Sequence, residues 1–307
     1  MRVLITGAAG FIGSHLYQKL KSENNEVIGI DNFSHASKNP INNEILRADI
    51  LNHKKTIDKF ISESDIVYHL AAQIHVDKSI KHPKQTIETN VLGTSNILES
   101  CRKHGKKLVF ASSSEVYGTS QTEQMGENHP LDAQSPYGAS KIAGDRLCKS
   151  YIDTYGMDIA ILRSFNTFGP YQDSGSEGRS YGAVIGIFTL QALTGEPITI
   201  FGDGEQRRDY MYIQDALRGY ELASNYRGVI NIGSGCDISI NYLAEKIIAL
   251  TGSKSEIKHI NPRPGEVMRL CADITKARSL GFNGETDFDK HLAEYIAWHK
   301  ENYDLQT

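Results

Sequence analysis

The sequence predicts an α/β protein built on a doubly wound parallel sheet, with a smaller second lobe interleaved with it. In the first half of the chain, apolar strand-like runs alternate with segments of helical pattern. The runs carry Val, Ile, Leu and Phe at consecutive positions, as do strands that are buried on both faces of a parallel sheet. With 307 residues, the chain is long enough for one large domain or for one domain and a smaller companion. Repeated strand-helix-strand units are expected to form right-handed crossovers.

The elements of the first half follow one another in a regular order. Strands are expected at residues 2–6, 26–31, 44–48, 66–71, 107–112 and 159–165. Helices are expected at residues 11–22, 54–62, 83–104 and 136–155. This alternation predicts a sheet that is covered by helices on both faces.

The composition of the sequence changes after Gly169. Residues 171–182 hold Ser, Gly, Asp, Glu and Arg with few apolar side chains, which predicts a loop. Beyond it we expect helices at 183–194, 241–251 and 289–301, strands at 198–201 and 228–232, and extended chain at 259–264. Residues 1–168 are expected to form the larger domain, with about 212–235 returning to it. Residues 169–211 and 236–307 then form the smaller lobe.

The composition excludes several classes of protein. Hydrophobic residues make up 39% of the chain and charged residues 23%, which excludes collagen-like and largely disordered chains. The net charge of −4 provides no positive field to hold nucleic acid or an anionic membrane. The chain has neither a long apolar run nor a basic stretch followed by an apolar one near its start. We therefore expect no membrane span, no signal peptide and a cytoplasmic protein.

The cysteines and histidines do not indicate a metal site. Cys101, Cys148, Cys236 and Cys271 lie more than thirty positions apart from one another, which excludes a local zinc site and predicts buried, reduced thiols. The histidines His53, His69, His75, His82 and His104 show no metal-ligand spacing with carboxylates. They are expected to be hydrogen-bonded or exposed side chains.

A glycine-rich loop joins the first expected strand to the first expected helix. Gly7, Gly10 and Gly13 form a Gly-x-x-Gly-x-x-Gly sequence in this strand-to-helix position. Gly7 suits a tight turn, Gly10 lets a pyrophosphate approach the backbone, and Gly13 allows close packing of the helix on the sheet. The N-terminus of the helix offers N–H groups and a positive dipole to phosphates. The loop therefore predicts a dinucleotide site.

Two carboxylates follow the second and third expected strands. Asp31 lies 24 positions after Gly7, where a carboxylate accepts both hydroxyls of an adenosine ribose and repels a 2′-phosphate. The next residues, 32–34, add no Arg, so NAD is favoured over NADP. Asp49 has two interpretations: an acceptor for the adenine amino group, or a helix N-cap.

A tyrosine and a lysine are expected to share one face of a helix. Ser135 suits the N-cap of this helix and Pro136 its first position. Tyr137 and Lys141 then lie one turn apart. An ammonium beside a phenol favours phenolate, as does a nearby nicotinamidium, so the pKa of Tyr137 is expected to fall from its usual value of about 10. Tyr137 is then a base for a sugar hydroxyl whose carbon loses hydride to NAD.

The segment 111–118 stands at the end of the fifth expected strand and carries three consecutive serines and Glu115. The carboxyl ends of parallel strands are where ligands bind in this architecture. A serine hydroxyl at this position is expected to bridge the reacting oxygen to Tyr137.

These features together resemble the extended short-chain dehydrogenases/reductases, specifically the NAD-dependent epimerase/dehydratase group that acts on nucleotide sugars. The resemblance covers essentially the whole chain. Its motifs are the glycine loop, Asp31, Leu70-Ala71-Ala72, Asn90, the Ser113/Tyr137/Lys141 set, residues 165–170, Gly202-Asp203-Gly204 with Arg208-Asp209, and Arg263-Pro264-Gly265-Glu266.

The resemblance implies roles for individual residues. Ser113 matches the catalytic Ser/Thr position, Tyr137 the base and Lys141 its partner, which also holds the nicotinamide ribose. Residues 1–168 become the NAD-binding Rossmann domain, and the smaller lobe binds the nucleotide sugar. The implied NAD-binding residues are Gly7, Gly10, Phe11, Ile12, Gly13, Asp31, Asn32, Ser34, Asp49, Ile50, Leu70, Ala71, Ala72, Asn90, Tyr137 and Lys141. The implied substrate-binding residues are Ser113, Ser114, Asn166, Arg208 and Arg263. The guanidiniums of the two arginines can bind phosphate oxygens.

The exact reaction is the point on which the motifs disagree. A 4-epimerase, a 4,6-dehydratase and a decarboxylase share a 4-keto intermediate, with NAD regenerated in each turnover. Dehydratases and decarboxylases of the group carry a Glu at the position of Glu115. Residues 75–79 also resemble a loop of the dehydratases. Gln172-Asp173, residues 181–185 and the 263–266 motif resemble UDP-hexose and UDP-N-acetylhexosamine 4-epimerases.

We expect a 4-epimerase, with a 4,6-dehydratase and then a UDP-glucuronate decarboxylase as alternatives. Ser114 stands where nucleoside-diphosphoglucose dehydratases carry Asp. A dinucleotide-binding sensor is the non-enzyme alternative, which the presence of Ser113, Tyr137 and Lys141 disfavours. A homodimer is implied through the helices expected at 83–104 and 136–155.

Overall fold

The computed structural model describes residues 1–37, 40–172, 183–284 and 287–302. Its main feature is a seven-stranded sheet with the order β10-β6-β5-β4-β1-β2-β3. Every neighbouring pair in this sheet is parallel, as the continuous apolar runs predict. The strands are β1 (Arg2–Thr6), β2 (Glu26–Asp31), β3 (Leu46–Arg47), β4 (Ile66–His69), β5 (Lys107–Ala111), β6 (Ile159–Ser164) and β10 (Gly228–Ile232).

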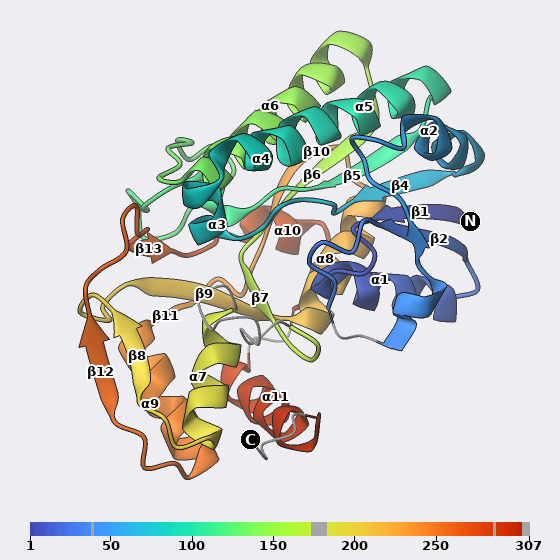
Figure 1. Ribbon diagram of the computed structural model, residues 1–307. Coiled ribbons are helices and arrows are strands. Elements are labelled where there is room, and N and C mark those ends of the chain that lie inside the picture. The colour runs from blue at the N-terminus through green and yellow to red at the C-terminus, as the bar shows by residue number, and fades with distance from the viewer. Residues whose placement is uncertain (38–39, 173–182, 285–286, 303–307) are drawn as a thin grey trace.

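Helices cover both faces of this sheet, so it is doubly wound (Figure 1). Helices α1 (Phe11–Ser22) and α8 (Ile213–Ser224) lie on one face, and α2 (Lys54–Glu63), α5 (Gly93–His104) and α6 (Pro136–Tyr155) lie on the other. The alternation of side chains along β1 explains the two layers. Val3 and Ile5 belong to the apolar cluster that includes the buried side chains of α1 and α8, whereas Leu4 belongs to the cluster of α2, α5 and α6.

The helix predicted over residues 83–104 is interrupted by one π-helical turn. It consists of α4 (Pro83–Ile87), the π turn Glu88–Leu92, and α5. Gly93 lies directly after the π turn, and a Cβ at this position would lie 2.4 Å from Cδ1 of Ile50. The glycine therefore lets this helix approach the loop that follows β3. The short helix α3 (Val76–Lys81) precedes it and was not predicted.

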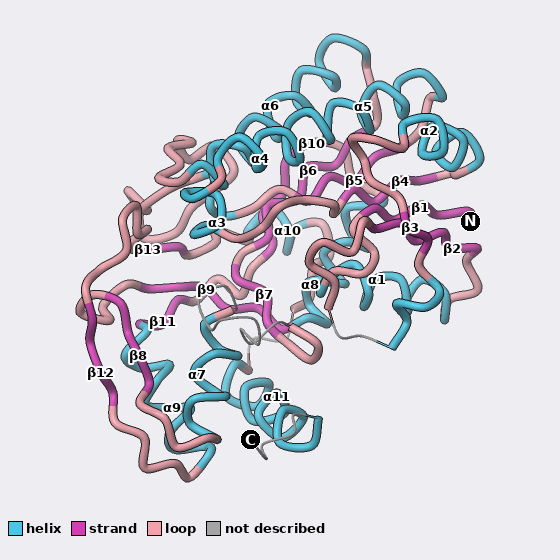
Figure 2. Tube along the Cα trace, viewed as in Figure 1, coloured by secondary structure: helices cyan, strands magenta, loops and turns pink. Residues whose placement is uncertain are grey.

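The smaller lobe contains two further sheets. In the first, β9 (Arg207–Tyr212) pairs with β7 (Asn166–Phe168), β11 (Asp237–Ser239) and β13 (Arg269–Leu270). In the second, β8 (Ile198–Phe201) pairs with β12 (Ile257–Ile260). Helix α7 (Val184–Leu193) packs against β8, α9 (Ile240–Thr251) against β8 and β11, and α11 (Phe288–Asn302) against β9 (Figure 2). The short helix α10 (Thr275–Ser279) packs against β10.

Several predicted boundaries differ from the structure. The strand predicted at 44–48 pairs only over Leu46–Arg47, because it lies at the sheet edge and the 3₁₀ turn Pro40–Glu44 precedes it. β7 lies within the predicted range 1–168 but pairs with β9. Most of the predicted loop 171–182 lies outside the described residues. No helix among the described residues has both the length and the apolarity to cross a membrane.

Candidate active site

A cavity of about 1920 Å³ lies between the carboxyl ends of the large sheet and the smaller lobe. It is lined by residues that follow β1, β2, β4, β5 and β6, and by residues from β8, β9 and the 263–267 segment. A ligand site at the carboxyl edge, where the strand order reverses between β1 and β4, is expected of this architecture. The predicted residues that line it are Gly7, Gly10, Phe11, Ile12, Gly13, Asp31, Asn32, Ser34, Asp49, Ile50, Leu70, Ala71, Ala72, Ser113, Ser114, Glu115, Tyr137, Lys141, Asn166, Arg208 and Arg263.

The glycine loop leaves no room for side chains. Gly7 has φ +75°, and a Cβ there would lie 2.6 Å from the backbone nitrogen of Ala71. A Cβ on Gly13 would lie 2.1 Å from the carbonyl oxygen of Gly7. Gly10 is the N-cap of α1 and carries no side chain to compete with a phosphate for the N–H groups of the helix.

Asp31 is held by backbone N–H groups at the end of β2. Its Oδ2 accepts from the nitrogen of Ala9 at 3.0 Å, and its Oδ1 accepts from the nitrogen of Phe33 at 2.7 Å. Burial raises the pKa of this carboxyl, and the N–H groups oppose that shift. Arg47 approaches from β3, a contact that was not predicted. Its guanidinium donates to the carbonyl of Asn32 at 3.0 Å and lies 4.7 Å above the ring of Phe33.

Asp49 closes the turn before α2 instead of capping that helix. Its Oδ2 accepts from Nδ2 of Asn32 at 2.8 Å, and its Oδ1 accepts from the nitrogen of Leu51 at 2.8 Å. His53 occupies the N-cap position of α2, so the N-cap interpretation of Asp49 is wrong. Burial favours the neutral acid, but these hydrogen bonds outweigh it and hold the pKa of Asp49 below its usual value.

Asn90 is the one predicted site residue that is not part of the cavity wall. Its side chain is buried in the π turn. Its Nδ2 donates to the carbonyl of Gln73 at 2.9 Å and to Oγ of Ser140 at 2.8 Å, while its Oδ1 accepts from the nitrogen of Gln73 at 2.7 Å. Asn90 therefore joins the wall segment that follows β4 to helix α6.

Ser113, Tyr137 and Lys141 converge at the end of β5. Tyr137 lies in the first turn of α6, where Oγ of Ser135 accepts from the nitrogen of Gly138 at 3.1 Å and caps the helix. Tyr137 and Lys141 are both buried, and the hydroxyl of Ser113 lies close enough to the phenol to lower its pKa. The Nζ of Lys141 donates to the carbonyl of Ala111 at 2.8 Å.

The pKa of Tyr137 differs from the sequence-based expectation. Burial raises the pKa of Tyr137 to about 12, the hydroxyl of Ser113 lowers it, and the charge of Glu115 raises it. Burial also lowers the pKa of Lys141 to about 8. The spacing of Tyr137 and Lys141 in the sequence does not report desolvation. Desolvation is the largest cause of both pKa shifts, because both groups lie inside the protein. Tyr137 therefore needs additional positive charge beside it to act as a base at neutral pH.

Two carboxylates and two guanidiniums line the side of the cavity opposite the glycine loop. Arg208 pairs with Glu266 at 3.1 Å (Nη2 to Oε1). Arg263 lies 3.8 Å from Asp77 and 4.0 Å above the centre of the Phe201 ring. Both arginines therefore already have carboxylate partners, which the sequence did not reveal.

Two other groups complete this side of the cavity. Glu115 is half-buried in the 3₁₀ turn Ser114–Val116, and burial raises its pKa, with Arg208 opposing and Glu266 reinforcing the shift. Among the described residues, Oδ1 of Asn166 is a buried acceptor that has no hydrogen-bond partner. A buried acceptor without a partner calls for an explanation, and at this place in the cavity wall a bound ligand would supply one.

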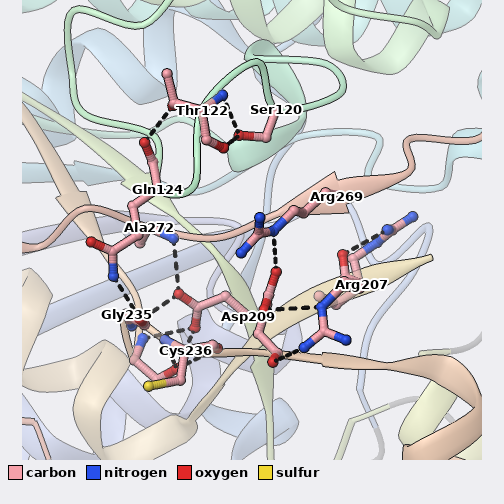
Figure 3. Close-up of polar contacts among 12 residues, drawn as sticks. Ser120, Thr122, Gln124, Arg207, Asp209, Gly235, Cys236, Arg269 and Ala272 are labelled. Carbon is pink, nitrogen blue, oxygen red and sulfur yellow. Dashed lines mark hydrogen bonds and ion pairs between the residues drawn. The ribbon is translucent and has the colours of Figure 1, made fainter. Parts of the chain in front are cut away.

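Asp209 lies next to Arg208 on β9 and joins this strand to two loops (Figure 3). Its buried carboxylate accepts through Oδ1 from the nitrogen and Oγ of Ser234 at 2.8 and 2.6 Å, and through Oδ2 from the nitrogens of Gly235 and Ala272, both at 3.0 Å. These bonds fix β9 between two loops and so hold the neighbouring Arg208 in place. Burial raises the pKa of this carboxyl.

The residues that could bind metal do not gather at one place. Among the described residues, no group of three or more His, Cys, Asp and Glu side chains could hold a metal ion. His69 is a buried core residue that contacts Oγ1 of Thr6 at 2.7 Å and Oγ1 of Thr94 at 3.0 Å. Cys101, Cys148 and Cys271 are buried, whereas Cys236 is exposed, contrary to the expectation of four buried thiols.

Comparison with known proteins agrees with this geometry. The sequence model of the NAD dependent epimerase/dehydratase family matches residues 3–233. A Methanocaldococcus jannaschii protein, described provisionally as a UDP-glucose 4-epimerase, is 41% identical over 98% of this chain and 99% of its own length. The dTDP-glucose 4,6-dehydratase of Streptomyces niveus is 31% identical over 98% of this chain and 94% of its own length. The structure of Thermotoga maritima UDP-glucose 4-epimerase with UDP-glucose superimposes with a TM-score of 0.91 at 32% identity, covering 98% of this chain and 99% of that one.

Proposed function

Because the chain belongs to the NAD-dependent epimerase/dehydratase family, we propose that it is a 4-epimerase of UDP-hexoses or UDP-N-acetylhexosamines. The observation that carries this choice is its likeness, over nearly the whole of both chains, to the archaeal protein described as a UDP-glucose 4-epimerase. The chain is an enzyme that works through a transient 4-keto sugar and regenerates NAD in each turnover.

The residues of the cavity fit NAD. The crowded backbone at Gly7 and Gly13 forms a cradle that only glycines allow, and the N-terminus of α1 points at it. Asp31 offers its carboxylate to a ribose. Bound NAD would supply the hydride acceptor and donor for the sugar, and its nicotinamidium would supply positive charge near Tyr137.

The protein groups then divide the chemistry among themselves. Tyr137 takes the proton of the C4 hydroxyl as the hydrogen on that carbon leaves as hydride, and returns it when the hydride comes back to the other face. The hydroxyl of Ser113 bonds the reacting oxygen. Arg208, Arg263 and Asn166 hold the diphosphate, which leaves the sugar free to turn in the cavity. A proton-transfer group of this kind typically contributes about 10²- to 10⁴-fold to the rate.

Mass spectrometry with NMR of the products tests this proposal. The purified protein is incubated with UDP-hexoses, UDP-N-acetylhexosamines, UDP-glucuronate, and dTDP- and GDP-sugars. We expect an unchanged mass and an inverted C4 configuration with a UDP-sugar. A loss of 18 daltons would contradict a 4-epimerase, and a loss of 44 daltons would indicate a decarboxylase.

A nucleotide-sugar 4,6-dehydratase is the second candidate. It is favoured by Glu115, a half-buried carboxyl whose charge reaches Tyr137. A dehydratase needs an additional acid/base to remove the C5 proton and expel the C6 hydroxyl, and burial prepares a carboxyl for that task by raising its pKa.

We also propose that the enzyme is a cytoplasmic homodimer. Ile80, Ile87, Leu92 and Tyr155 are each more than 40% exposed, and they lie on α3, α4, the π turn and α6. Such side chains on neighbouring helices suit a helical interface with a second copy. The three buried thiols suit a reducing compartment. Sedimentation equilibrium is expected to give twice the chain mass, and a monomer at micromolar concentration would contradict the dimer.

A further inference from the structure

A buried ion pair lies directly behind the catalytic groups and has no part in the chemistry described so far. Asp145 and Arg163 are 1% and 3% exposed. Their contact is bidentate, with Nε to Oδ2 at 2.8 Å and Nη2 to Oδ1 at 2.9 Å. Removing two charges from water costs about as much free energy as their attraction returns, so such a pair contributes little to stability by itself. Its position in the fold suggests a different role.

Asp145 continues the helix face that carries the catalytic residues. Tyr137, Lys141 and Asp145 are spaced four residues apart on α6, so they lie on one face in three successive turns. Each contacts one of three consecutive residues at the end of β5. The phenol of Tyr137 lies by the hydroxyl of Ser113, which lowers its pKa, Lys141 donates to the carbonyl of Ala111, and Oδ2 of Asp145 accepts from Oγ of Ser112 at 3.0 Å.

The carboxylate of Asp145 is itself fixed from the opposite side. Besides Asp145, Arg163 donates through Nη1 to the hydroxyl of Tyr117 at 2.9 Å and to the carbonyl of Glu127 at 2.9 Å. The hydroxyl of Tyr117 in turn donates to Oδ1 of Asn231 at 2.6 Å. The network therefore ties α6, β6 and β10 to the point where the chain leaves β5.

We propose that Asp145, held by Arg163, is a positioning residue that fixes Ser112 and thereby sets Ser113 against Tyr137. The inference rests on the proposed function, because it concerns the same reacting groups. Ser112 directly precedes Ser113 in the chain. A shift of Ser112 therefore also moves the hydroxyl of Ser113. A displacement of about 1 Å at a reacting group costs up to roughly 10²-fold in rate.

The test is a double-mutant cycle with Ser112→Ala and Asp145→Asn. The readout is the rate of absorbance rise near 340 nm in the NAD-loaded enzyme at saturating nucleotide sugar, together with KM, bound NAD per chain and Tm. Hydride transfer from C4 is common to epimerase, dehydratase and decarboxylase, so the readout does not depend on the final product.

The matched control is a second carboxylate with the same kind of partners outside the site. Asp58 accepts from Oγ of Ser100 at 2.7 Å and pairs with Lys103 at 2.8 Å. Asp58→Asn and Ser100→Ala therefore remove the same chemical contacts between α2 and α5.

We expect Ser112→Ala to slow hydride transfer about tenfold and Asp145→Asn about 100-fold, each with KM within about twofold of wild type and NAD still bound. The double variant is expected to be no slower than Asp145→Asn alone, because both changes break one link. The control variants are expected to lower Tm and keep the wild-type rate.

A wild-type rate in Ser112→Ala, or a double variant as slow as the product of the two single effects, overturns the positioning role. If Asp145→Asn does not fold, Ser112→Ala alone decides, since it keeps the ion pair. If the wild-type enzyme gives a product 18 daltons lighter than its substrate, only the assignment as a 4-epimerase is overturned. A wild-type enzyme inert toward every nucleotide sugar overturns the proposed function and this inference with it.

Discussion

The two sides of the cavity recognise ligands by different means. The side formed by β1, β2 and α1 uses backbone: glycines that admit no Cβ, the N-terminus of a helix, and a carboxylate held by backbone N–H groups. The side formed by β9 and the 263–267 segment uses charged side chains that already have partners, Arg208 with Glu266 and Arg263 with Asp77. The first side is therefore preformed, whereas in the proposed function the two arginines of the second side would exchange their carboxylate partners for a diphosphate.

Tyr137 stands between the two sides, and its loss is expected to have the largest effect. Tyr137→Phe removes the group that takes the C4 proton while it keeps the ring that is packed there. We expect kcat to fall by about 10³-fold with NAD content unchanged, measured by coupled assay and by NAD release on denaturation. Activity within tenfold of wild type would show that another group is the base.

A side chain on the backbone side is expected to destroy cofactor binding. In Gly13→Ala, the Cβ would lie 2.1 Å from the carbonyl oxygen of Gly7, so the loop must move. We expect NAD affinity to fall at least 100-fold in calorimetry. Gly126→Ala is the matched control, because its Cβ would have an ordinary contact at 3.6 Å from Oδ2 of Asp273. Wild-type affinity in Gly13→Ala would contradict a preformed backbone cradle.

On the charged side, substrate affinity is expected to change while NAD affinity does not. Arg208→Ala is expected to raise KM about 100-fold, because this guanidinium is largely buried and its loss leaves Glu266 unpaired. Arg263→Ala is expected to raise KM only about tenfold, since its pair with Asp77 is longer and more exposed. Equal effects of the two substitutions, or loss of NAD from either, would break the distinction between the two sides.

Glu115→Gln is expected to have the smallest effect if the enzyme is a 4-epimerase. The charge of Glu115 raises the pKa of Tyr137, so its removal lowers that pKa and phenolate forms at lower pH. The acid limb of the kcat profile should then move to lower pH, with the maximal kcat within about threefold of wild type. The other groups around Tyr137, namely Ser113, Lys141 and Tyr220, stay unchanged. Collapse of turnover with substrate binding intact would instead identify Glu115 as an acid/base and favour the dehydratase.

The sequence was most informative where the interacting groups are close together along the chain. The glycine loop and the spacing of Tyr137 and Lys141 need only a strand-to-helix junction or a single helical turn, and both could be predicted. The carboxylate partners of Arg208 and Arg263, and the Ala9 nitrogen that donates to Asp31, come from distant segments, so these contacts and the approach of Arg47 could not be predicted. Asn90 was assigned to the NAD site from the family resemblance, but its contacts to Gln73 and Ser140, which form only in the folded chain, place it outside the cavity wall.

Burial and short strands account for many of the other differences, but helix α8 (Ile213–Ser224) and strand β9 (Arg207–Tyr212) are longer elements that were also not predicted. The pKa of Tyr137 was expected to fall, and the folded protein raises it, because desolvation depends on packing that no local motif reports. In the smaller lobe, β7, β11 and β13 have two or three residues each, too few for a recognisable pattern. The large sheet was predicted because six of its strands have four to six residues, are mainly apolar and are regularly separated by helices, whereas β3 pairs over only two residues.

The most direct test follows a labelled hydrogen through the reaction. UDP-glucose and UDP-N-acetylglucosamine carrying deuterium at C4 are incubated with the NAD-loaded protein, and the products are examined by NMR and mass spectrometry. Return of the hydride to the carbon that lost it predicts a product of unchanged mass, with deuterium still at C4 and the configuration there inverted. Deuterium missing from C4, or a product lighter by 18 daltons, would contradict this account.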